Sequence, residues 1–379
     1  MILVGLASLA LLSCNKQEPS VTPTPNPDPQ PVPKDTVLIV VGQEQSVGSA
    51  DYYDAVVWID GKRLALTSGD HDAFCNAVQA VEDTIYIVGC EAIGELIDDG
   101  YYDPYNANNG VLWKFVLGKE NEIERSVYSD VKGNSSVVGV SVSGKNVYAC
   151  GFDSPGFDRR ALYWKNSEKI ELTDGTTDAL AYCIASEGDD VYVGGYVQSA
   201  KVGADGYATI WKNGEPQYLT TDGALAKVNK IVVKNGHVYA AGAYKVSGEK
   251  WRGAIWVDGV QTLFTEAVGT AVGGLYVDDE GNWIVNGNMS KDNGNIVACN
   301  WYSDGTVEEI SSDMALCEGV GIAVCGEHRY TIGNMTDFDY STFEDISKAY
   351  LWDGSKMVDG MEITTPDNFA YWDLTVALF

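Results

Sequence analysis

Short runs of β-branched and aromatic residues recur along the chain from residue 36 onward, separated by turns rich in Gly, Asn and Asp. Examples are T-I-Y-I-V-G-C, N-V-Y-A-C-G-F and D-V-Y-V-G-G-Y. Runs of this length and composition are typical of half-buried strands rather than helices. The N-G and D-G pairs between them favour tight antiparallel hairpins. The pattern therefore predicts an all-β protein.

Two ladders of single residues set the period of this pattern. Seven tryptophans recur at intervals of 45 to 55 residues, each near the end of a short strand: Trp58, Trp113, Trp164, Trp211, Trp256, Trp301 and Trp352. Seven glycines keep the same period one strand earlier: Gly42, Gly89, Gly151, Gly195, Gly242, Gly287 and Gly333. A period of roughly 40–50 residues marks a repeat architecture. Each unit reads as four antiparallel strands, with Trp in the third, and we expect the tryptophans to pack between units.

Seven such units predict a seven-bladed β-propeller of four-stranded antiparallel blades over residues 36–379. The first unit begins at its second strand, residues 36–42, and one spare strand follows the last unit at residues 370–378. Pairing the spare strand inside the first unit would complete that blade. This closure by a C-terminal strand would also remove the open edge of an incomplete sheet.

The first 35 residues have a different composition. Residues 2–12 are apolar, too few to span a membrane, and lead into Ser13-Cys14. This run is typical of a signal peptide over residues 1–14, although an N-terminal strand is the alternative. No Lys or Arg precedes it, so we expect a start codon upstream. Residues 15–35 carry Pro at nearly every second position, which predicts an extended tether of roughly 60 Å.

The repeat units resemble the seven-bladed propeller class, and the leader resembles that of lipoproteins from Bacteroidetes-type bacteria. Leu11-Leu12-Ser13-Cys14 is similar to a lipobox, which implies lipidation of Cys14. The resemblance implies a lipid-anchored protein of the bacterial cell envelope, on the periplasmic or surface side of the outer membrane. The units lack the paired G-H and W-D of WD40 repeats and the double Gly of kelch repeats, so no activity is implied.

The net charge of the chain narrows the classes of partner that we expect for this protein. The chain has 54 Asp and Glu against 25 Lys and Arg, a formal charge of −29. Such a surface repels phosphate backbones, which excludes nucleic acid as an expected partner. The acidity otherwise serves solubility, and we expect a monomeric body. Only three His occur and none has zinc-ligand spacing, so no metal or cofactor is predicted.

Seven cysteines follow Cys14, and two of them are placed symmetrically about the expected turn at Glu82-Asp83. An unbroken hairpin would put Cys75 opposite Cys90, within reach of a disulfide bond. The alternative is two buried free thiols that pack as small apolar residues.

The connections between second and third strands are longer and more varied than the other turns: 43–53, 91–109, 153–160, 197–206, 245–252, 289–295 and 335–347. Antiparallel geometry gathers them on one face, which we call the long-loop face, and loops on a rigid scaffold commonly bind ligands. Two of them combine carboxylates with aromatic rings that suit sugars: Asp98, Asp99, Tyr101, Tyr102, Asp103 and Tyr105, then Asp337, Asp339 and Tyr340. Candidates for binding acidic ligands are the basic residues Arg159, Arg160 and Arg252, together with the neighbouring Trp251. The alternatives are a solvated acidic loop and outer-rim charge.

These features favour a non-enzymatic, membrane-tethered module that binds a glycan or an envelope protein on the long-loop face. A second hypothesis is a carbohydrate-active hydrolase or lyase. It would use acids with His71, which Asp70 and Asp72 flank, as a general base near the propeller axis. A third hypothesis is a structural scaffold for an envelope complex. The residues alone leave all three open.

Overall fold

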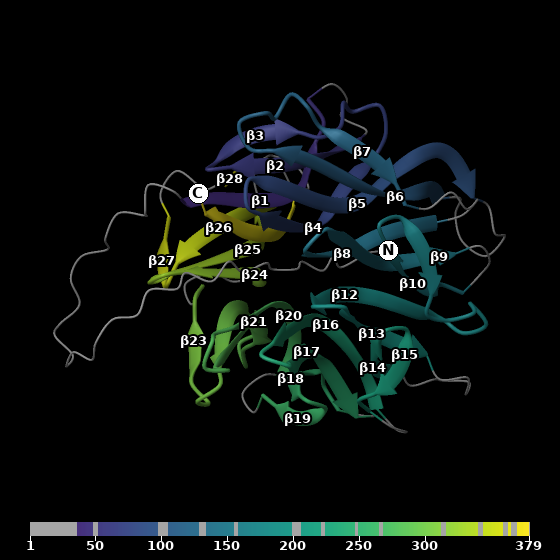
Figure 1. The fold of residues 1–379 in the computed structure, drawn as a ribbon. Helices are drawn as coiled ribbons and strands as arrows, with labels where there is room; N and C mark the ends of the chain where they lie inside the picture. The colour runs from purple at the N-terminus through teal and green to yellow at the C-terminus, as the bar shows by residue number, and fades with distance from the viewer. Residues whose placement is uncertain are drawn as a thin grey trace.

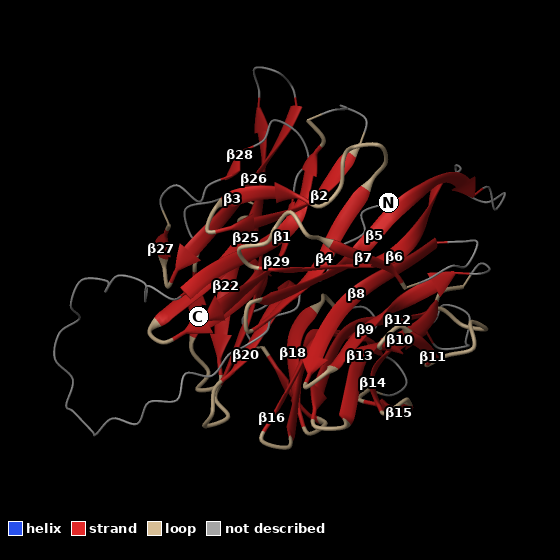
Figure 2. Cartoon of the chain, turned by 45° about the horizontal axis from the view of Figure 1, so that its top comes forward, coloured by secondary structure: helices blue, strands red, loops and turns tan. Residues whose placement is uncertain are grey.

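The computed structural model describes most of the chain from Thr36 to Leu378. The described ranges are 36–47, 52–97, 105–128, 134–154, 158–198, 206–220, 224–246, 249–264, 268–311, 316–339, 344–358, 363–364 and 370–378. Within these ranges the secondary structure consists of strands and turns, with no helix (Figure 2). The predicted all-β class is therefore confirmed.

Antiparallel pairing groups the described strands into runs of four, each of which we call a blade. A single parallel pair, Asn108 of β6 with Asn134 of β8, joins two of these runs into one eight-stranded sheet. Blade 1 contains β29 (Ala370–Leu378), β1 (Thr36–Gln45), β2 (Tyr53–Ile59) and β3 (Lys62–Ala65). Blade 2 contains β4 (Ala73–Val81), β5 (Thr84–Ile97), β6 (Tyr105–Val116) and β7 (Glu124–Val127). Blade 3 contains β8 (Asn134–Ser143), β9 (Asn146–Ser154), β10 (Arg160–Lys165) and β11 (Glu168–Glu171).

The remaining blades repeat this order. Blade 4 contains β12 (Ala179–Glu187), β13 (Asp190–Gln198), β14 (Gly206–Lys212) and β15 (Glu215–Tyr218). Blade 5 contains β16 (Ala224–Lys234), β17 (His237–Val246), β18 (Arg252–Val257) and β19 (Val260–Leu263). Blade 6 contains β20 (Val268–Val277), β21 (Trp283–Ser290), β22 (Ile296–Tyr302) and β23 (Val307–Glu309). Blade 7 contains β24 (Cys317–Cys325), β25 (His328–Asp339), β26 (Glu344–Asp353) and β27 (Lys356–Met357), and β28 (Ile363–Thr364) also pairs with β26.

The first strands of the blades form the inside of a closed ring. β29, β4, β8, β12, β16, β20 and β24 each contact the next in this order, and β24 contacts β29. Figure 1 looks roughly along the ring axis, with these strands around the centre and the fourth strands at the periphery. The ring closes as predicted, because the C-terminal β29 pairs antiparallel with the N-terminal β1.

Buried tryptophans fill the space between neighbouring blades. Each tryptophan of the ladder lies in the third strand of its blade and is at most 3% exposed. Trp113 of blade 2 packs in one cluster with Ile39 and Val57 of blade 1. Trp58 of blade 1 packs with Ile332 of blade 7, which continues the pattern across the ring closure. Because burial of an aromatic side chain is strongly stabilising, the ladder holds each blade to the one before it.

One extra residue interrupts every inner strand. The pairing of first and second strands shifts by one between Cys75 and Ala77, and equivalent shifts occur in the other inner strands. Such a β-bulge bends its strand and redirects the side chains on it. The bulge falls opposite the glycine ladder, so the two features belong together.

Those glycines leave room for the bulge. A Cβ on Gly195 would lie 1.9 Å from the carbonyl oxygen of Leu180, and a Cβ on Gly242 would lie 1.9 Å from that of Lys227. Both contacts are far shorter than any real Cβ contact, and backbone cannot give way as a side-chain tip can. The ladder therefore marks the points where the second strand meets the bulged backbone.

The bulge also corrects the prediction of a disulfide bond. Cys75 lies opposite Gly89, and Cys90 lies opposite Phe74, one residue out of the expected register. Since successive side chains of a strand point to opposite faces, the two thiols face away from each other. Both cysteines are free and buried, so the predicted bridge is wrong and the alternative of two buried thiols is correct.

Two of the expected long loops consist largely of strands. β5 continues to Ile97 and pairs with β6 from Tyr105 onward, so paired strands occupy most of 91–109. Likewise β25 continues to Asp339 and pairs with β26 from Glu344 onward, within the expected loop 335–347. These hairpins extend beyond the neighbouring blades, because their polar and aromatic sequence still permits ladder hydrogen bonds.

We predict that Gly195→Ala destabilises the ring by about 1–3 kcal/mol, since the added methyl group collides with the Leu180 carbonyl. Gly242→Ala should behave alike. Gly206→Ala is the matched control, because its Cβ would meet a ring carbon of Tyr196 at 3.3 Å, which small adjustments accommodate. Urea unfolding measures all three. Equal stability of Gly195→Ala and Gly206→Ala would contradict this account of the ladder.

Candidate functional site

The topology brings together strand ends from blades 3, 4 and 5 on the long-loop face. The inner strands β12 and β16 begin there, the second strands β9 and β13 end there, and β10 begins there. Five residues from these ends form a connected cluster around Arg159, which precedes β10. The sequence predicted Arg159 and missed the residues around it.

A half-buried ion pair holds Arg159 in place. Its guanidinium donates to both carboxylate oxygens of Asp178, from Nε at 2.7 Å and from Nη2 at 2.6 Å. The Tyr196 hydroxyl donates to the same carboxylate, and Arg159 Nη2 lies 2.9 Å from that hydroxyl oxygen. Burial alone would raise the pKa of the Asp178 carboxyl, but the hydrogen bonds from Arg159 and Tyr196 hold it below its ordinary value. The bidentate geometry makes this a rigid, charge-balanced element.

Aromatic rings connect the pair to a lysine on the next inner strand. The ring centroids of Tyr182 and Tyr196 are 5.9 Å apart. The Lys227 ammonium lies 5.7 Å from the centroid of Tyr182, within the range of a cation–π contact. Among the described residues, no carboxylate forms an ion pair with Lys227, and burial lowers the pKa of its ammonium. The axial cluster, as we call Phe152, Arg159, Asp178, Tyr182, Tyr196 and Lys227, thus joins three blades.

An open groove lies outward of this cluster, between blades 3 and 4. Its volume is about 490 Å³, and its lining residues are Glu171, Leu172, Thr173, Asp174, Thr177, Val197 and Tyr218. The Tyr218 side chain is 55% exposed and meets the Tyr207 ring edge-on at 5.8 Å. Asp174 accepts hydrogen bonds from the Thr176 hydroxyl and amide, which lower the pKa of its carboxyl. An exposed aromatic face beside carboxylate and hydroxyl groups is suited to a sugar ring.

The groove and the axial cluster are continuous along the chain. Thr177 of the groove precedes Asp178, and Val197 of the groove follows Tyr196. Val197 packs toward blade 3, whereas Tyr196 packs with Leu180 and Phe152. The groove and the axial cluster therefore lie next to each other in the sequence at the end of blade 4.

The other predicted basic residues have different environments. Arg160 is committed to ion pairs with Asp153 at 2.8 Å and Glu171 at 2.7 Å, so it serves packing between strands. Trp251 lies beside Lys245, whose ammonium is 5.9 Å from the ring centroid. Arg252 begins β18 and pairs with Tyr244. Among the described residues, no hydrogen bond, ion pair or ring contact joins Trp251 or Arg252 to the axial cluster.

The predicted acidic and aromatic loop residues fall mostly outside the described part of the chain. Those outside are Asp98, Asp99, Tyr101, Tyr102, Asp103 and Tyr340, together with the lipidation candidate Cys14. Tyr105 lies in β6, and Asp337 and Asp339 lie in β25, where only the backbone is described. Their assignment to a ligand site stays a prediction.

The histidine hypothesis concerns the connection that precedes β4. The Asp72 carboxylate accepts the Tyr53 amide at 3.0 Å, and Asp70 accepts the Ser68 hydroxyl at 3.0 Å. Within the described ranges, no hydrogen bond joins His71 to either carboxylate. Asp72 has the same task as Asp178, whose carboxylate accepts the amide of Arg159 at 3.2 Å. Both aspartates thus position the start of a third strand. Each lies directly before an inner strand in the sequence, and that position could have predicted this role.

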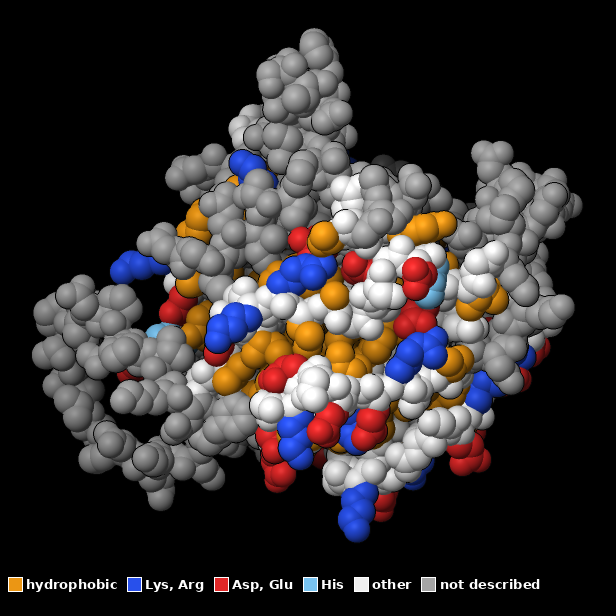
Figure 3. Space-filling model, turned by 90° about the horizontal axis from the view of Figure 1, so that it is seen from above, with side chains coloured by type: hydrophobic (Ala, Val, Ile, Leu, Met, Phe, Trp, Pro, Cys, Tyr) orange, Lys and Arg blue, Asp and Glu red, His pale blue; other side chains and the backbone are white. Residues whose placement is uncertain are grey.

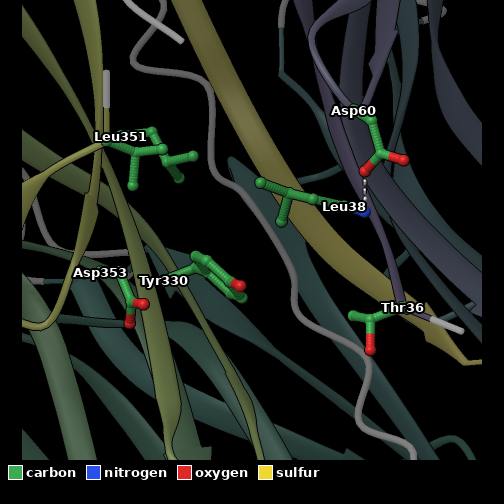
Figure 4. A pocket seen from close by; sticks show the side chains of 7 residues that line it. Thr36, Leu38, Asp60, Tyr330, Leu351 and Asp353 are labelled. Carbon is green, nitrogen blue, oxygen red and sulfur yellow. Dashed lines mark hydrogen bonds between the residues drawn. The ribbon is translucent and has the colours of Figure 1, made fainter. Parts of the chain in front are cut away.

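A second pocket lies at the ring closure, between blades 7 and 1 (Figure 4). Its volume is about 230 Å³, and Thr36, Leu38, Asp60, Tyr330, Leu351, Asp353 and Val358 line it. The Asp60 carboxylate accepts the Leu38 amide at 2.9 Å, and Asp353 accepts the Arg329 amide and hydrogen-bonds His328. Asn166, Asn213 and Asp258 do the same for their second strands, so these side chains are a repeated cap.

No group of three or more His, Cys, Asp or Glu in the described ranges is arranged to hold a metal ion. A search of the same residues finds no apolar helix of membrane-spanning length. On the described surface, Lys and Arg side chains lie among Asp and Glu, as the view from the β3 edge of the ring illustrates (Figure 3).

Comparison with known proteins identifies the architecture. No family model and no curated protein matches the chain. Among solved structures, it is similar to puromycin hydrolase, with a TM-score of 0.50 and 10% identity over 86% of this chain and 53% of that one. The β-propeller domain of the Trilobed protease from Pyrococcus furiosus has a TM-score of 0.49 and 13% identity, covering 88% and 95%. The fold is a β-propeller.

TolB from Acinetobacter baumannii is a further similar structure, with a TM-score of 0.40 and 12% identity over 72% of this chain and 65% of that one. The chain thus spans about two thirds of TolB and about half of the puromycin hydrolase chain. At these identities the likeness concerns the fold alone and carries no activity to this chain.

A buried lysine lies deeper on the same inner strand as Lys227. Lys230 is 3% exposed, and its burial lowers the pKa of the ammonium to about 8, although the carboxylate of Asp373 opposes this effect. Asp373 itself accepts the Val78 amide of blade 2 at 2.7 Å, so it links the C-terminal strand to the next blade.

Replacing Lys230 by Met should stabilise the protein near neutral pH. The pKa of about 8 in the folded state is below the ordinary 10.5, so the unfolded chain binds the proton more tightly between these values. The destabilisation is fully present below about pH 8 and is relieved as the pH rises toward 10.5. We expect Lys230→Met to raise the free energy of unfolding on the order of 2 kcal/mol at about pH 7, and less at about pH 10. Urea unfolding at both pH values tests this, and a pH-independent difference would contradict it.

Proposed function

We propose that this β-propeller is a binding module that takes a glycan on its long-loop face, in the groove beside the axial cluster. The observation that supports it is the exposed Tyr218 ring at a groove whose polar lining includes Asp174, Thr173 and Thr177. A sugar offers C–H faces to an aromatic ring and hydroxyl groups to carboxylates. The groove is open, which suits one part of an extended chain rather than a small enclosed substrate.

The ligand is an oligosaccharide rather than a protein surface in this proposal. A protein interface of ordinary size buries about 800 Å² on each side and centres on apolar anchors. The groove presents carboxylate and hydroxyl groups around a single exposed ring. A glycan array probed with residues 36–379, followed by pull-down from envelope extract, separates the two. Binding to proteins alone would overturn the glycan proposal.

We predict that Tyr218→Ala lowers the affinity for the glycan found on the array roughly tenfold, because the stacking surface is lost. Asp174→Ala should weaken binding as well, since its carboxylate no longer accepts sugar hydroxyls. Val260→Ala is the control, because Val260 is 72% exposed and follows a turn on the opposite face. Isothermal titration calorimetry gives the affinities. Unchanged binding of Tyr218→Ala would remove the groove from the proposal.

We also propose that the propeller is held at the bacterial cell envelope by a lipid on Cys14. The support is the apolar run before Cys14 and the proline-rich segment after it. Expression in a bacterial host with radiolabelled palmitate should label the wild-type chain, and Cys14→Ser should abolish the label. Equal labelling of both, or no label in the wild type, would exclude this anchor.

A further inference from the structure

Lys227 is a half-buried lysine that lies beside the aromatic rings of the axial cluster. Arg159 of the same cluster pairs with Asp178, and Lys234, on the same strand as Lys227, pairs with Asp279 at 2.6 Å. Lys227 has only the Tyr182 ring as a described partner of its charge.

We infer that the Lys227 ammonium binds the carboxylate of an acidic saccharide, a uronic acid unit of the glycan. This inference rests on the proposed function and names the chemical class of its ligand. A half-buried ammonium that has no carboxylate partner among the described residues attracts an anion, since burial removes part of its hydration. The bound carboxylate would form an ion pair with it.

The rest of the axial cluster suits a sugar ring that carries this carboxylate. Tyr182 and Tyr196 present neighbouring aromatic rings beside Lys227. Phe152, Val138 and Leu180 pack around them and fix their positions. Arg159 is already neutralised by Asp178, so it acts as a positioning residue for Tyr196 and leaves Lys227 as the cation that the ligand meets.

The position of Lys227 also connects it to the groove. Lys227 lies three residues after the start of β16, at the end of the inner strand that faces the long loops. Tyr182 and Tyr196 connect it to Asp178 and Val197, where the groove begins. A saccharide chain with one unit on Tyr218 can therefore extend toward the axis and place a further unit beside Lys227.

The overall charge limits the anions that fit. A formal charge of −29 repels a dense polyanion such as a nucleic acid. Charges beyond about 8–10 Å are screened at physiological salt, so the nearest cation contributes most to the binding of a single carboxylate. A saccharide with separated carboxylates is compatible with both conditions.

The test compares an oligosaccharide that contains a single galacturonate unit with the same oligosaccharide after chemical reduction of its carboxylate to an alcohol. Calorimetry measures both ligands with the wild-type protein, Lys227→Met, Lys227→Arg and the control Lys234→Met. We expect the wild type to bind the acidic form about tenfold more tightly than the reduced form. Lys227→Met should abolish that preference, whereas Lys227→Arg and Lys234→Met should keep it. The acidic preference should also weaken as salt rises.

The outcomes separate this inference from the proposed function. If the wild type binds both forms equally and Tyr218→Ala weakens both, the glycan site stands and the carboxylate assignment is wrong. If Lys227→Met weakens both forms equally while remaining folded by circular dichroism, Lys227 acts in packing and the inference is overturned. If neither saccharide binds in any form, the proposed function fails, and the inference fails with it. If a poly-glutamate peptide competes with the saccharide and binds with equal affinity, the ligand is an acidic protein segment. That result would overturn the assignment of a saccharide.

Discussion

The contact between the bulged inner strand and the glycine of the second strand is the constraint on which the blade depends. The extra residue brings a backbone carbonyl into the space that a side chain of the second strand would occupy. Only glycine tolerates that approach. The glycine ladder on the second strands and the bulges on the inner strands are therefore the two sides of the same contact. It shifts the register by one residue within each blade, which separates Cys75 from Cys90. The residue without a pairing partner at this shift is Tyr182 in blade 4 and Asn229 in blade 5.

A second layer of interactions joins the blades into a ring. The tryptophans pack each blade against the one before it. Two positions after several of these tryptophans, an Asp or Asn side chain accepts a backbone amide of a neighbouring strand. Asp373 links the C-terminal strand to blade 2, which ties the end of the chain to its beginning. Because these contacts are repeated around the ring, they fix the positions of the strand ends. The axial cluster uses that rigidity, because its residues come from three different blades.

Electrostatics distinguish the cluster from the rest of the described surface. Many basic side chains that the structure describes have carboxylate partners. Arg159 is one of them, so its charge is neutralised and it serves to position Tyr196. Lys227 is half-buried, has no ion-pair partner among the described residues, and lies beside aromatic rings next to a groove. This combination of an ammonium, aromatic rings and a groove is the physical basis for assigning a ligand to this position.

The sequence by itself determined the all-β class, the four-stranded unit, the third-strand position of the tryptophans and the closing role of residues 370–378, because period and turn chemistry are local properties. It also marked Arg159, through its charge on a long connection. Only the tertiary structure decided the inner-strand bulges, since a one-residue shift appears when two strands are paired. It likewise decided that loops 91–109 and 335–347 are mostly strand, and that Asp178, Tyr182, Tyr196 and Lys227 meet. Asp178, Tyr182 and Tyr196 belong to blade 4, whereas Lys227 comes from blade 5. Their contact depends on the pairing of distant strands and on the packing of neighbouring blades, which no local pattern encodes.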